Sequence, residues 1–284
     1  MNPKQAPRFP LFITGHPRSG TTMLRLIFNS HSQIAIPDET GLLHWFYKRP
    51  WYKKYTRSKI PIPSPKSRAF GEDIIHNFNQ QPRSLRNDPK KAISFLYEAL
   101  AAKEGKPYWG DKTPLHTQFT DQIIALFPDA FIVNLIRDPR AVISSAKRNV
   151  KKKREGTDFW ITDDLNKTIE RWRWEFGLIN KFCDKYPQNT LKLIYEDFVA
   201  NPEKHLRSIC SNLGVAFEPG MLQYHKERKK ETIGMNDWHK ETTKPVNANN
   251  IDKWRDELTK EEIGTIEKEL DREMRDAGYQ MSQL

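Results

Sequence analysis

The residues that could do chemistry begin with a glycine-bounded loop at residues 15–22, which reads GHPRSGTT. It keeps the two glycines of a phosphate-binding loop, Gly15 and Gly20, and places the hydroxyls of Thr21 and Thr22 directly after them. Glycines at these positions let backbone N–H groups turn inward at the start of a helix, where they bind an anion. Because a strand-like run precedes the loop and a helical pattern follows it, the sequence predicts an anion site here.

The loop lacks the lysine that contacts the β- and γ-phosphates in ATP- and GTP-hydrolysing enzymes. Thr21 occupies that position, and Arg18 is the only cation inside the loop. The apolar run FIVNLIRD, at residues 131–138, ends in Arg-Asp and does not match the strand that supplies a metal-binding aspartate. A P-loop small-molecule kinase is therefore the second choice of function.

A second anion-binding pattern follows the most apolar run of the chain, residues 130–138. Arg137 lies at the end of this run, and Ser145 lies eight residues further on in a predicted helix. An arginine fork suits a phosphate dianion, and a helix N-terminus adds partial positive charge. Pairing of Arg137 with Asp138 is the alternative interpretation. Two anion sites suit a nucleotide that carries phosphates on both its 3′ and 5′ sides.

These motifs resemble those of sulfotransferases that use 3′-phosphoadenosine 5′-phosphosulfate, and most of all the tyrosylprotein sulfotransferases and their bacterial relatives. The resemblance implies that Arg137 and Ser145 hold the 3′-phosphate. The segments LIYEDFVANP and TKPVNANNIDKWRDEL resemble family elements that place Tyr195 and Lys244 beside the nucleotide. The residues that the resemblance assigns to the 5′-phosphosulfate are Arg18, Ser19, Gly20, Thr21 and Thr22.

The resemblance also nominates the groups that would carry out the transfer. Lys112, in GDKTP, matches the active-site lysine of the family and would bind the bridging oxygen or the sulfonate. Glu39, in PDET, matches a glutamate of the tyrosylprotein sulfotransferases and would act as the general base. His116 competes with it, because small-molecule sulfotransferases use a histidine directly after Lys-Thr, where this chain has Pro114.

Other interpretations of these residues stay open. Asp38 or Glu39 could cap a helix N-terminus, and His16 and His44 are further candidate bases without a motif. A sulfonate carries less charge than a phosphoryl group, so fixed cations can replace Mg²⁺, and we expect no metal.

Strand-like and helix-like segments alternate along the chain. This alternation predicts an α/β fold with a mainly parallel sheet flanked by helices. The family resemblance implies that this is a P-loop-like sulfotransferase fold, formed by a single domain over residues 1–284. Residues 41–106 match no strand pattern, and we expect them to be an insertion that forms part of the acceptor pocket. The predicted strands are 11–15, 33–37, 107–111, 130–138 and 190–197, and the predicted helices are 88–103, 116–127, 139–148, 163–185, 202–213 and 260–278.

Composition limits the choice of partners. The formal net charge of +11 favours anionic partners, and the aromatic and basic run HWFYKRPWYKKYTRSK, at residues 44–59, raises the alternative of a nucleic-acid-binding protein. No helix-turn-helix, zinc or RNP motif supports that alternative, so we expect no nucleic acid. A second basic cluster, KRNVKKKR at residues 147–154, could be a solvated helix end and loop. The two cysteines form no disulfide framework, and no signal peptide or membrane span is visible, which predicts a cytoplasmic protein. The expected acceptor is a hydroxyl of a small molecule, carbohydrate or peptide.

Overall fold

A five-stranded parallel sheet is the centre of the computed structural model, which describes residues 7–47, 60, 65–150, 164–228, 243–249 and 251–282. The strands are hydrogen-bonded in the order β2-β3-β1-β4-β5, and each of the four pairings is parallel. The predicted α/β fold class is confirmed. The strands are β1 (Leu11–Gly15), β2 (Ile34–Ala35), β3 (Tyr108–Lys112), β4 (Phe131–Ile136) and β5 (Thr190–Ile194).

The central strands are apolar because both of their faces are covered. Every residue of β1 and β4 is buried, as expected for parallel strands between two layers of helices. Successive side chains alternate between the two faces. Phe12 and Ile132 join one hydrophobic cluster, whereas Leu11 and Val133 join the other.

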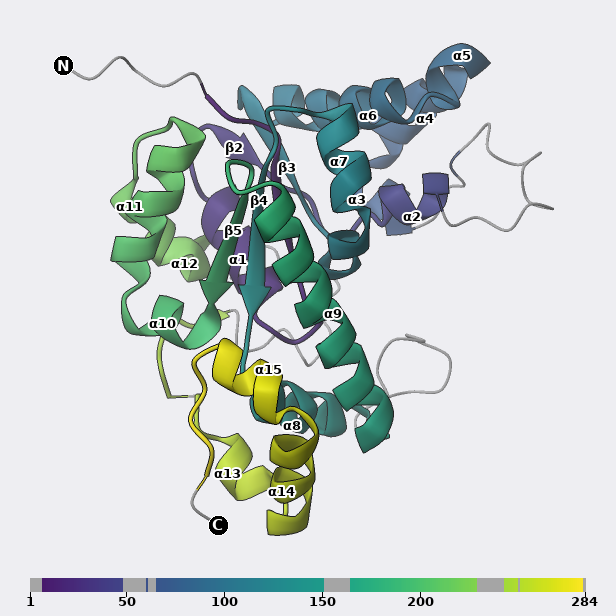
Figure 1. Ribbon diagram of the computed structural model, residues 1–284. Coiled ribbons are helices and arrows are strands. Elements are labelled where there is room, and N and C mark those ends of the chain that lie inside the picture. The colour runs from purple at the N-terminus through teal and green to yellow at the C-terminus, as the bar shows by residue number, and fades with distance from the viewer. Residues whose placement is uncertain are drawn as a thin grey trace.

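Helices cover the two faces in separate groups (Figure 1). The face of Leu11 is covered by α1 (Thr21–Asn29), α10 (Tyr195–Ala200), α11 (Pro202–Leu213) and α12 (Tyr224–Arg228), with η3 (Pro219–Gln223). The face of Phe12 is covered by α2 (Leu42–Tyr47), α3 (Pro65–Phe70), α4 (Glu72–Gln80), α6 (Pro89–Lys103) and α7 (Thr120–Leu126), with the short α5 (Arg83–Arg86) and η2 (Pro114–Phe119) beside them.

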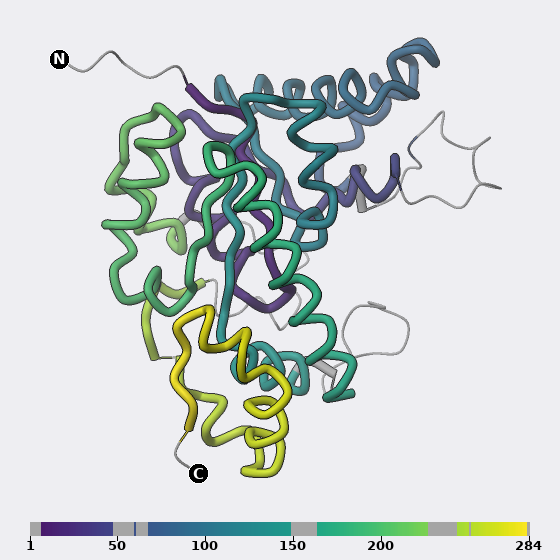
Figure 2. The backbone as a smooth tube through the Cα atoms, viewed as in Figure 1, coloured from purple at the N-terminus to yellow at the C-terminus, as the bar shows by residue number. Residues whose placement is uncertain are grey.

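A third group of helices shares a hydrophobic cluster near the carboxyl ends of the strands. It consists of α8 (Pro139–Val150), the long α9 (Leu165–Lys185), α13 (Trp254–Glu257), α14 (Lys260–Glu269) and α15 (Asp271–Asp276). Helix α9 also extends along the sheet and packs against β5 and η2 (Figure 1). Figure 2 follows the yellow C-terminal segment to its place beside α8, and α4 to α6 lie at the opposite end of the sheet. The C-terminal helices therefore support the end of the sheet at which phosphate-binding loops lie.

Several predicted elements differ from the structure; for example, the helix predicted over 116–127 is the 3₁₀ helix η2 followed by α7. The strand predicted over 190–197 ends at Ile194, because Tyr195 begins α10 and turns its ring into the core. The single helix predicted over 260–278 is two helices that meet at Leu270, whose φ of −112° leaves the helical region. Leu270 and Met274 are both fully buried, so the bend keeps the apolar stripe on the core. The segment 41–106, for which one helix was predicted, contains α2 to α6.

Local capping signals mark the ends of two helices. Thr259 and Glu262 form a capping box at the start of α14. Pro202 occupies the first turn of α11, and Gly214 ends that helix at a φ of 75°. Asn201 occupies the N-cap position of α11, but its side chain makes no capping bond.

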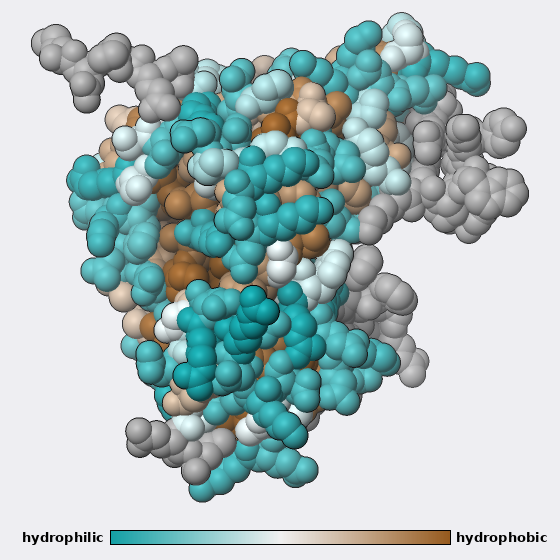
Figure 3. All heavy atoms as spheres, viewed as in Figure 1, coloured by the Kyte–Doolittle hydropathy of each residue, from teal (hydrophilic) through white to brown (hydrophobic). Residues whose placement is uncertain are grey.

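The outer surface of the C-terminal helices is polar. On the face in Figure 3, α14 and α15 present mostly hydrophilic side chains, which agrees with their exposed charged residues. Within the described ranges, no helix combines the length and the apolar character that a membrane crossing requires.

Gly15→Ala should destabilise the fold, because the backbone of β4 occupies the space that a side chain on this glycine would need. A Cβ atom on Gly15 would lie 2.2 Å from the carbonyl oxygen of Leu135, and its φ of 131° disfavours any side chain. We expect a loss of about 3 kcal/mol or more in the free energy of unfolding, measured by urea denaturation.

Gly177→Ala on α9 is the matched control, because its Cβ would meet nothing within 4 Å. This change should be neutral or should stabilise the protein by roughly 0.5–1 kcal/mol. Equal stability of the two variants would show that the contact of Gly15 with Leu135 is easily relaxed.

Candidate active site

The loop after β1 has the backbone geometry of an anion-binding turn. Arg18 and Gly20 have φ values of 75° and 100°, in the left-handed region that favours glycine and is uncommon for arginine. The Ser19 hydroxyl donates to the carbonyl oxygen of His16 at 2.5 Å and closes the turn. Because the first helical bond of α1 runs from the amide of Leu24 to the carbonyl of Gly20, the preceding amides of the helix have no intrahelical partner. Thr21 and Thr22 lie in this first turn, as predicted.

The two predicted anion motifs come together at this turn. Arg18 Nε donates to the Oγ atom of Ser145 on α8 at 3.2 Å. Arg137, at the end of β4, donates from Nη1 to the carbonyl oxygen of Arg18 at 3.1 Å, and its guanidinium lies 4.3 Å from the ring centre of Tyr195. A Cβ atom on Gly20 would lie 2.7 Å from that same ring. Residues that the sequence assigned to the 5′ and 3′ sides of a nucleotide are therefore neighbours.

Positive charge accumulates at this turn and affects the pKa of Arg18. Burial, together with the charges of Arg137 and Arg148, lowers the pKa of Arg18 to about 10, and Glu39 opposes this shift. The Arg18 side chain thus stays protonated at neutral pH while it lies among like charges. A bound anion would relieve this repulsion, so the chemistry of the turn fits a nucleotide that carries phosphate or phosphosulfate groups.

Lys112 and Glu39 form the second part of the site. Lys112 Nζ, at the end of β3, lies 2.5 Å from Glu39 Oε1 and 3.3 Å from the Oγ1 atom of Thr22 in the loop. The Lys112 side chain is 3% exposed and the Glu39 side chain 53% exposed. The ammonium group is therefore fixed at the loop, and the carboxylate can reach a ligand from solvent.

The segment that carries Glu39 is anchored by residues on both of its sides. Arg25 on α1 is buried, and its guanidinium lies 2.9 Å from Asp38 Oδ1 while it donates to the carbonyl of Ile36 at 3.1 Å. Asp38 and Glu39 thus bind cations, and the backbone N–H of Leu42 at the start of α2 donates instead to the hydroxyl of Thr40. The sequence analysis missed Arg25, although its place one turn into α1 could have drawn attention to it.

Asp111 is the centre of a buried polar network that the sequence analysis also missed. Its Oδ1 atom lies 2.7 Å from His116 Nδ1, and its Oδ2 atom accepts hydrogen bonds from Tyr97 and Thr40. Burial favours the neutral acid, but the charge of His116 and these hydrogen bonds together lower the pKa of Asp111. Because Thr40 follows Glu39 and Asp111 precedes Lys112, the network holds the catalytic candidates in place. The adjacent aspartate and lysine in GDKTP are the sequence feature that could have indicated this network.

The alternative base His116 lies inside this network. Its side chain is 1% exposed, and its Nε2 atom is buried with no hydrogen-bond partner among the described residues. His44 stacks on the His116 ring with the ring centres 5.8 Å apart. His16, the third candidate, faces α9 rather than solvent and is only 6% exposed.

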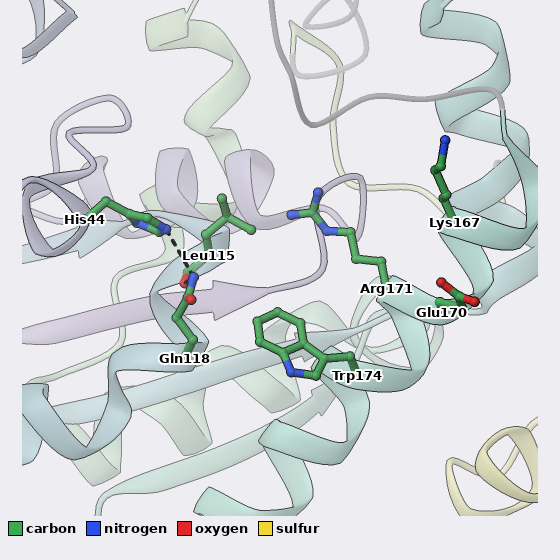
Figure 4. A pocket seen from close by; sticks show the side chains of 7 residues that line it. All are labelled: His44, Leu115, Gln118, Lys167, Glu170, Arg171 and Trp174. Atoms are coloured by element: carbon green, nitrogen blue, oxygen red, sulfur yellow. Dashed lines mark hydrogen bonds between the residues drawn. The ribbon is translucent and has the colours of Figure 1, made fainter. Parts of the chain in front are cut away.

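A cleft of about 700 Å³ lies beside these residues, between α2, η2 and α9. Figure 4 shows His44 and Gln118 on one side, with their side-chain nitrogens 3.1 Å apart, and Arg171 and Trp174 projecting from α9 opposite them. The lining residues are His44, Leu115, Gln118, Lys167, Glu170, Arg171 and Trp174.

Several predicted residues have structural partners. The carbonyl of Lys244 accepts a hydrogen bond from the hydroxyl of Tyr224, and a contact of Lys244 with a nucleotide stays a prediction. In the basic run 147–154, Lys147 pairs with Glu262 and Arg148 with Glu257, while residues 151–154 lie outside the described residues.

A metal site would need several His, Cys, Asp or Glu side chains close together within the described ranges. These ranges hold no group of three or more His, Cys, Asp or Glu side chains that could bind a metal ion. Transfer without a metal stays a prediction.

The parallel sheet has an anion-binding turn after its first strand. Cations lie at the carboxyl ends of three neighbouring strands. These features are those of an enzyme that binds a phosphorylated nucleotide. The family model described as "Sulfotransferase family" matches residues 10–219, well over half of the 284 residues. The chain belongs to the sulfotransferase family. The predicted family, fold and enzyme class are confirmed, and 3′-phosphoadenosine 5′-phosphosulfate is the donor general to that family.

Relatives at low identity agree with this assignment. The chain is 24% identical over 266 residues to protein-tyrosine sulfotransferase A of Caenorhabditis elegans; the match covers 92% of this chain and 62% of the relative. Among solved structures, the sulfotransferase domain from the curacin biosynthetic pathway aligns with a TM-score of 0.67 at 20% identity, over 97% of this chain and 100% of the domain. The sulfotransferase domain of the Synechococcus PCC 7002 olefin synthase gives 0.66 at 20% identity, over 99% of both chains. These likenesses identify the fold as the P-loop-like sulfotransferase fold.

Arg137→Ala should weaken the binding of adenosine 3′,5′-bisphosphate chiefly through the 3′-phosphate. Loss of a charge-assisted bond predicts a reduction of about 2 kcal/mol, or roughly 30-fold, by isothermal titration calorimetry. Binding of adenosine 5′-monophosphate should change by less than about threefold.

Arg207→Ala is the control, since Arg207 pairs with Glu203 on the exposed surface of α11. Equal losses for both nucleotides would contradict the assignment. Arg137 would then act through its bond to the Arg18 carbonyl and not on the 3′-phosphate.

Proposed function

We propose that this protein transfers a sulfuryl group from 3′-phosphoadenosine 5′-phosphosulfate to a hydroxyl acceptor, by in-line displacement and without a metal. One observation carries the proposal: Lys112 contacts both Thr22 of the anion-binding turn and the exposed carboxylate of Glu39. The group proposed for donor binding, Thr22, and the group proposed to act on the acceptor, Glu39, thus both contact the ammonium group of Lys112.

The loop and the two arginines would hold the nucleotide. The amides at the start of α1, with the side chains of Arg18 and Thr22, would bind the 5′ side, and Arg137 with Ser145 would bind the 3′-phosphate. The ring of Tyr195 packs on both Arg137 and the loop glycine, which supports its predicted place on the nucleotide side. The bound donor supplies the sulfuryl group, and adenosine 3′,5′-bisphosphate is released.

Two side chains would act on the reacting atoms. Lys112 would stabilise the negative charge that develops on the oxygen between sulfur and the 5′-phosphate as that bond breaks. Glu39 keeps Oε1 on Lys112 and can offer its second oxygen to the acceptor hydroxyl, whose proton it would take as the new oxygen–sulfur bond forms. The exposure of Glu39 favours it over His116, which is buried beneath His44.

The cleft between α2, η2 and α9 is the proposed acceptor pocket. Its lining includes Leu115 and Gln118 on η2, and this helix begins at Pro114, two positions after Lys112 in the chain. Of the expected insertion 41–106, His44 on α2 contributes to the described lining. A protein tyrosine, as in the name of the C. elegans relative, is one candidate acceptor, and a sugar or small-molecule hydroxyl are the others.

A cytoplasmic location belongs to the proposal as well. It is supported by Cys183 and Cys210, neither of which forms a disulfide.

Nucleotide binding without magnesium tests the proposed function. With EDTA present, adenosine 3′,5′-bisphosphate at 100 times its dissociation constant should stabilise the protein by about 2.7 kcal/mol, seen as a rise in melting temperature. ATP with Mg²⁺ should have little effect, and transfer of a radiolabelled sulfuryl group to hydroxyl acceptors should proceed in EDTA. Stabilisation by Mg²⁺-ATP alone would instead favour the kinase alternative.

Glu39→Gln should keep donor affinity and lose turnover. Removal of a general base predicts a fall in kcat of about 10²–10⁴-fold, while binding of adenosine 3′,5′-bisphosphate should change by less than about twofold. The matched control is Glu98→Gln, the same change at an exposed glutamate of α6. If Glu39→Gln keeps its turnover and His116→Gln loses it, His116 is the base.

A further inference from the structure

His16, the residue after Gly15, is buried against helix α9 in a defined tautomer. Its Nδ1 atom lies 2.6 Å from the carbonyl oxygen of Pro17, and since a carbonyl only accepts, Nδ1 carries a proton and donates it. Burial and the nearby charge of Arg171 lower the pKa of His16 to about 3, so the ring is neutral at pH 7. The Nε2 atom therefore presents a lone pair.

Glu175 on α9 faces this lone pair. Its Oε2 atom lies 3.9 Å from His16 Nε2, while its Oε1 atom accepts from Arg171 Nε at 3.3 Å. Both Oε2 and Nε2 are buried, and neither has a hydrogen-bond partner among the described residues. An ionised carboxylate would set two lone pairs against each other, whereas a proton on Oε2 would donate to Nε2 after a small approach.

We propose that Glu175 is a positioning residue whose protonated carboxyl group hydrogen bonds to His16 and fastens the nucleotide-binding turn to α9. The same carboxyl group accepts a hydrogen bond from Arg171, which lines the acceptor cleft, so one carboxyl group contacts both binding regions, and its proton acts on the contact to His16. This inference rests on the proposed function. When the proton leaves, repulsion between Oε2 and Nε2 releases the turn, and donor binding weakens.

The pH range follows from the surroundings of Glu175. Burial raises the pKa of Glu175 to about 8, although Arg171 opposes the shift. Because the raised pKa keeps the acid protonated below about pH 8, the contact to His16 is present there and is lost at higher pH.

Two ionisable groups in the described residues contact Glu175 or face it: Arg171 from α9 and His16 from the turn. Several other ionisable groups on α9 and on the elements packed against it form ion pairs of their own. These pairs include His116 with Asp111 on η2 and β3, Lys147 with Glu262 on α8 and α14, Arg173 with Glu273 on α9 and α15, and Lys185 with Asp121 on α9 and α7.

Glu175→Gln tests the role of the titratable proton separately from the shape and hydrogen bonds of the side chain. The glutamine amide can accept from Arg171 and donate to His16, as the protonated acid does, and it does not titrate. The affinity of wild-type protein for adenosine 3′,5′-bisphosphate should fall by about tenfold between pH 7 and pH 9, because about one molecule in eleven then keeps the proton. Glu175→Gln should match wild type at pH 7 and stay constant to pH 9. Asp184→Asn, another carboxylate-to-amide change on α9, should keep the wild-type profile.

Two results would overturn the proposal. One is a Glu175→Gln variant that binds the nucleotide more than about threefold more weakly than wild type at pH 7; the other is a variant whose affinity falls above pH 8 as in wild type. A second readout needs no nucleotide: the ¹⁵N resonance of His16 Nε2 in the unliganded wild-type protein should shift near pH 8 and stay constant in Glu175→Gln. If this resonance behaves as expected but adenosine 3′,5′-bisphosphate does not bind, the proposed function fails and the contact stands. If the nucleotide binds and the resonance does not shift, the contact fails and the proposed function stands.

Discussion

The candidate active site requires three positively charged side chains to lie close together in the absence of a bound anion. Arg18, Arg137 and Lys112 come from three different segments and converge on a single turn. Their mutual repulsion is offset by fixed acceptors: the Ser145 hydroxyl, the Arg18 carbonyl and the Glu39 carboxylate. The parallel sheet makes this possible, since the carboxyl ends of β1, β3 and β4 lie at one edge. Preorganised charge of this kind costs stability in the folded protein and favours anion binding and transfer.

The residues that could be predicted from the sequence are those with a local signature. The turn, Arg137 and Lys112 each follow an apolar strand, and parallel strands bring their carboxyl ends together, so proximity followed from the order of elements. The place of Tyr195 on the nucleotide side stays a prediction, supported by its contact with Arg137, whereas its predicted strand conformation was wrong. It begins a helix, because burial of its ring between Gly20 and Arg137 requires the chain to turn there.

The residues that could not be predicted act through contacts between segments far apart in the chain. Asp111 joins Thr40, Tyr97 and His116, and His16 meets Glu175, with no repeating spacing that marks either group. Buried polar residues in a sequence read as ordinary loop or helix positions until their partners are known. The bend at Leu270 is similar, because local helical preference continues through it and tertiary packing decides where the helix ends.

In the proposed mechanism Lys112, on the neighbouring strand β3, takes the place of the lysine absent from the turn. This placement links binding of the donor to binding of the acceptor. In an ordinary P-loop the ammonium group moves with the loop and its helix, whereas Lys112 is the last residue of β3 and η2 begins two positions later. A displacement of Lys112 toward a bound donor would shift the lining of the acceptor cleft directly. Occupancy of either pocket should therefore alter the affinity of the other, and thermodynamic linkage makes that effect equal in both directions.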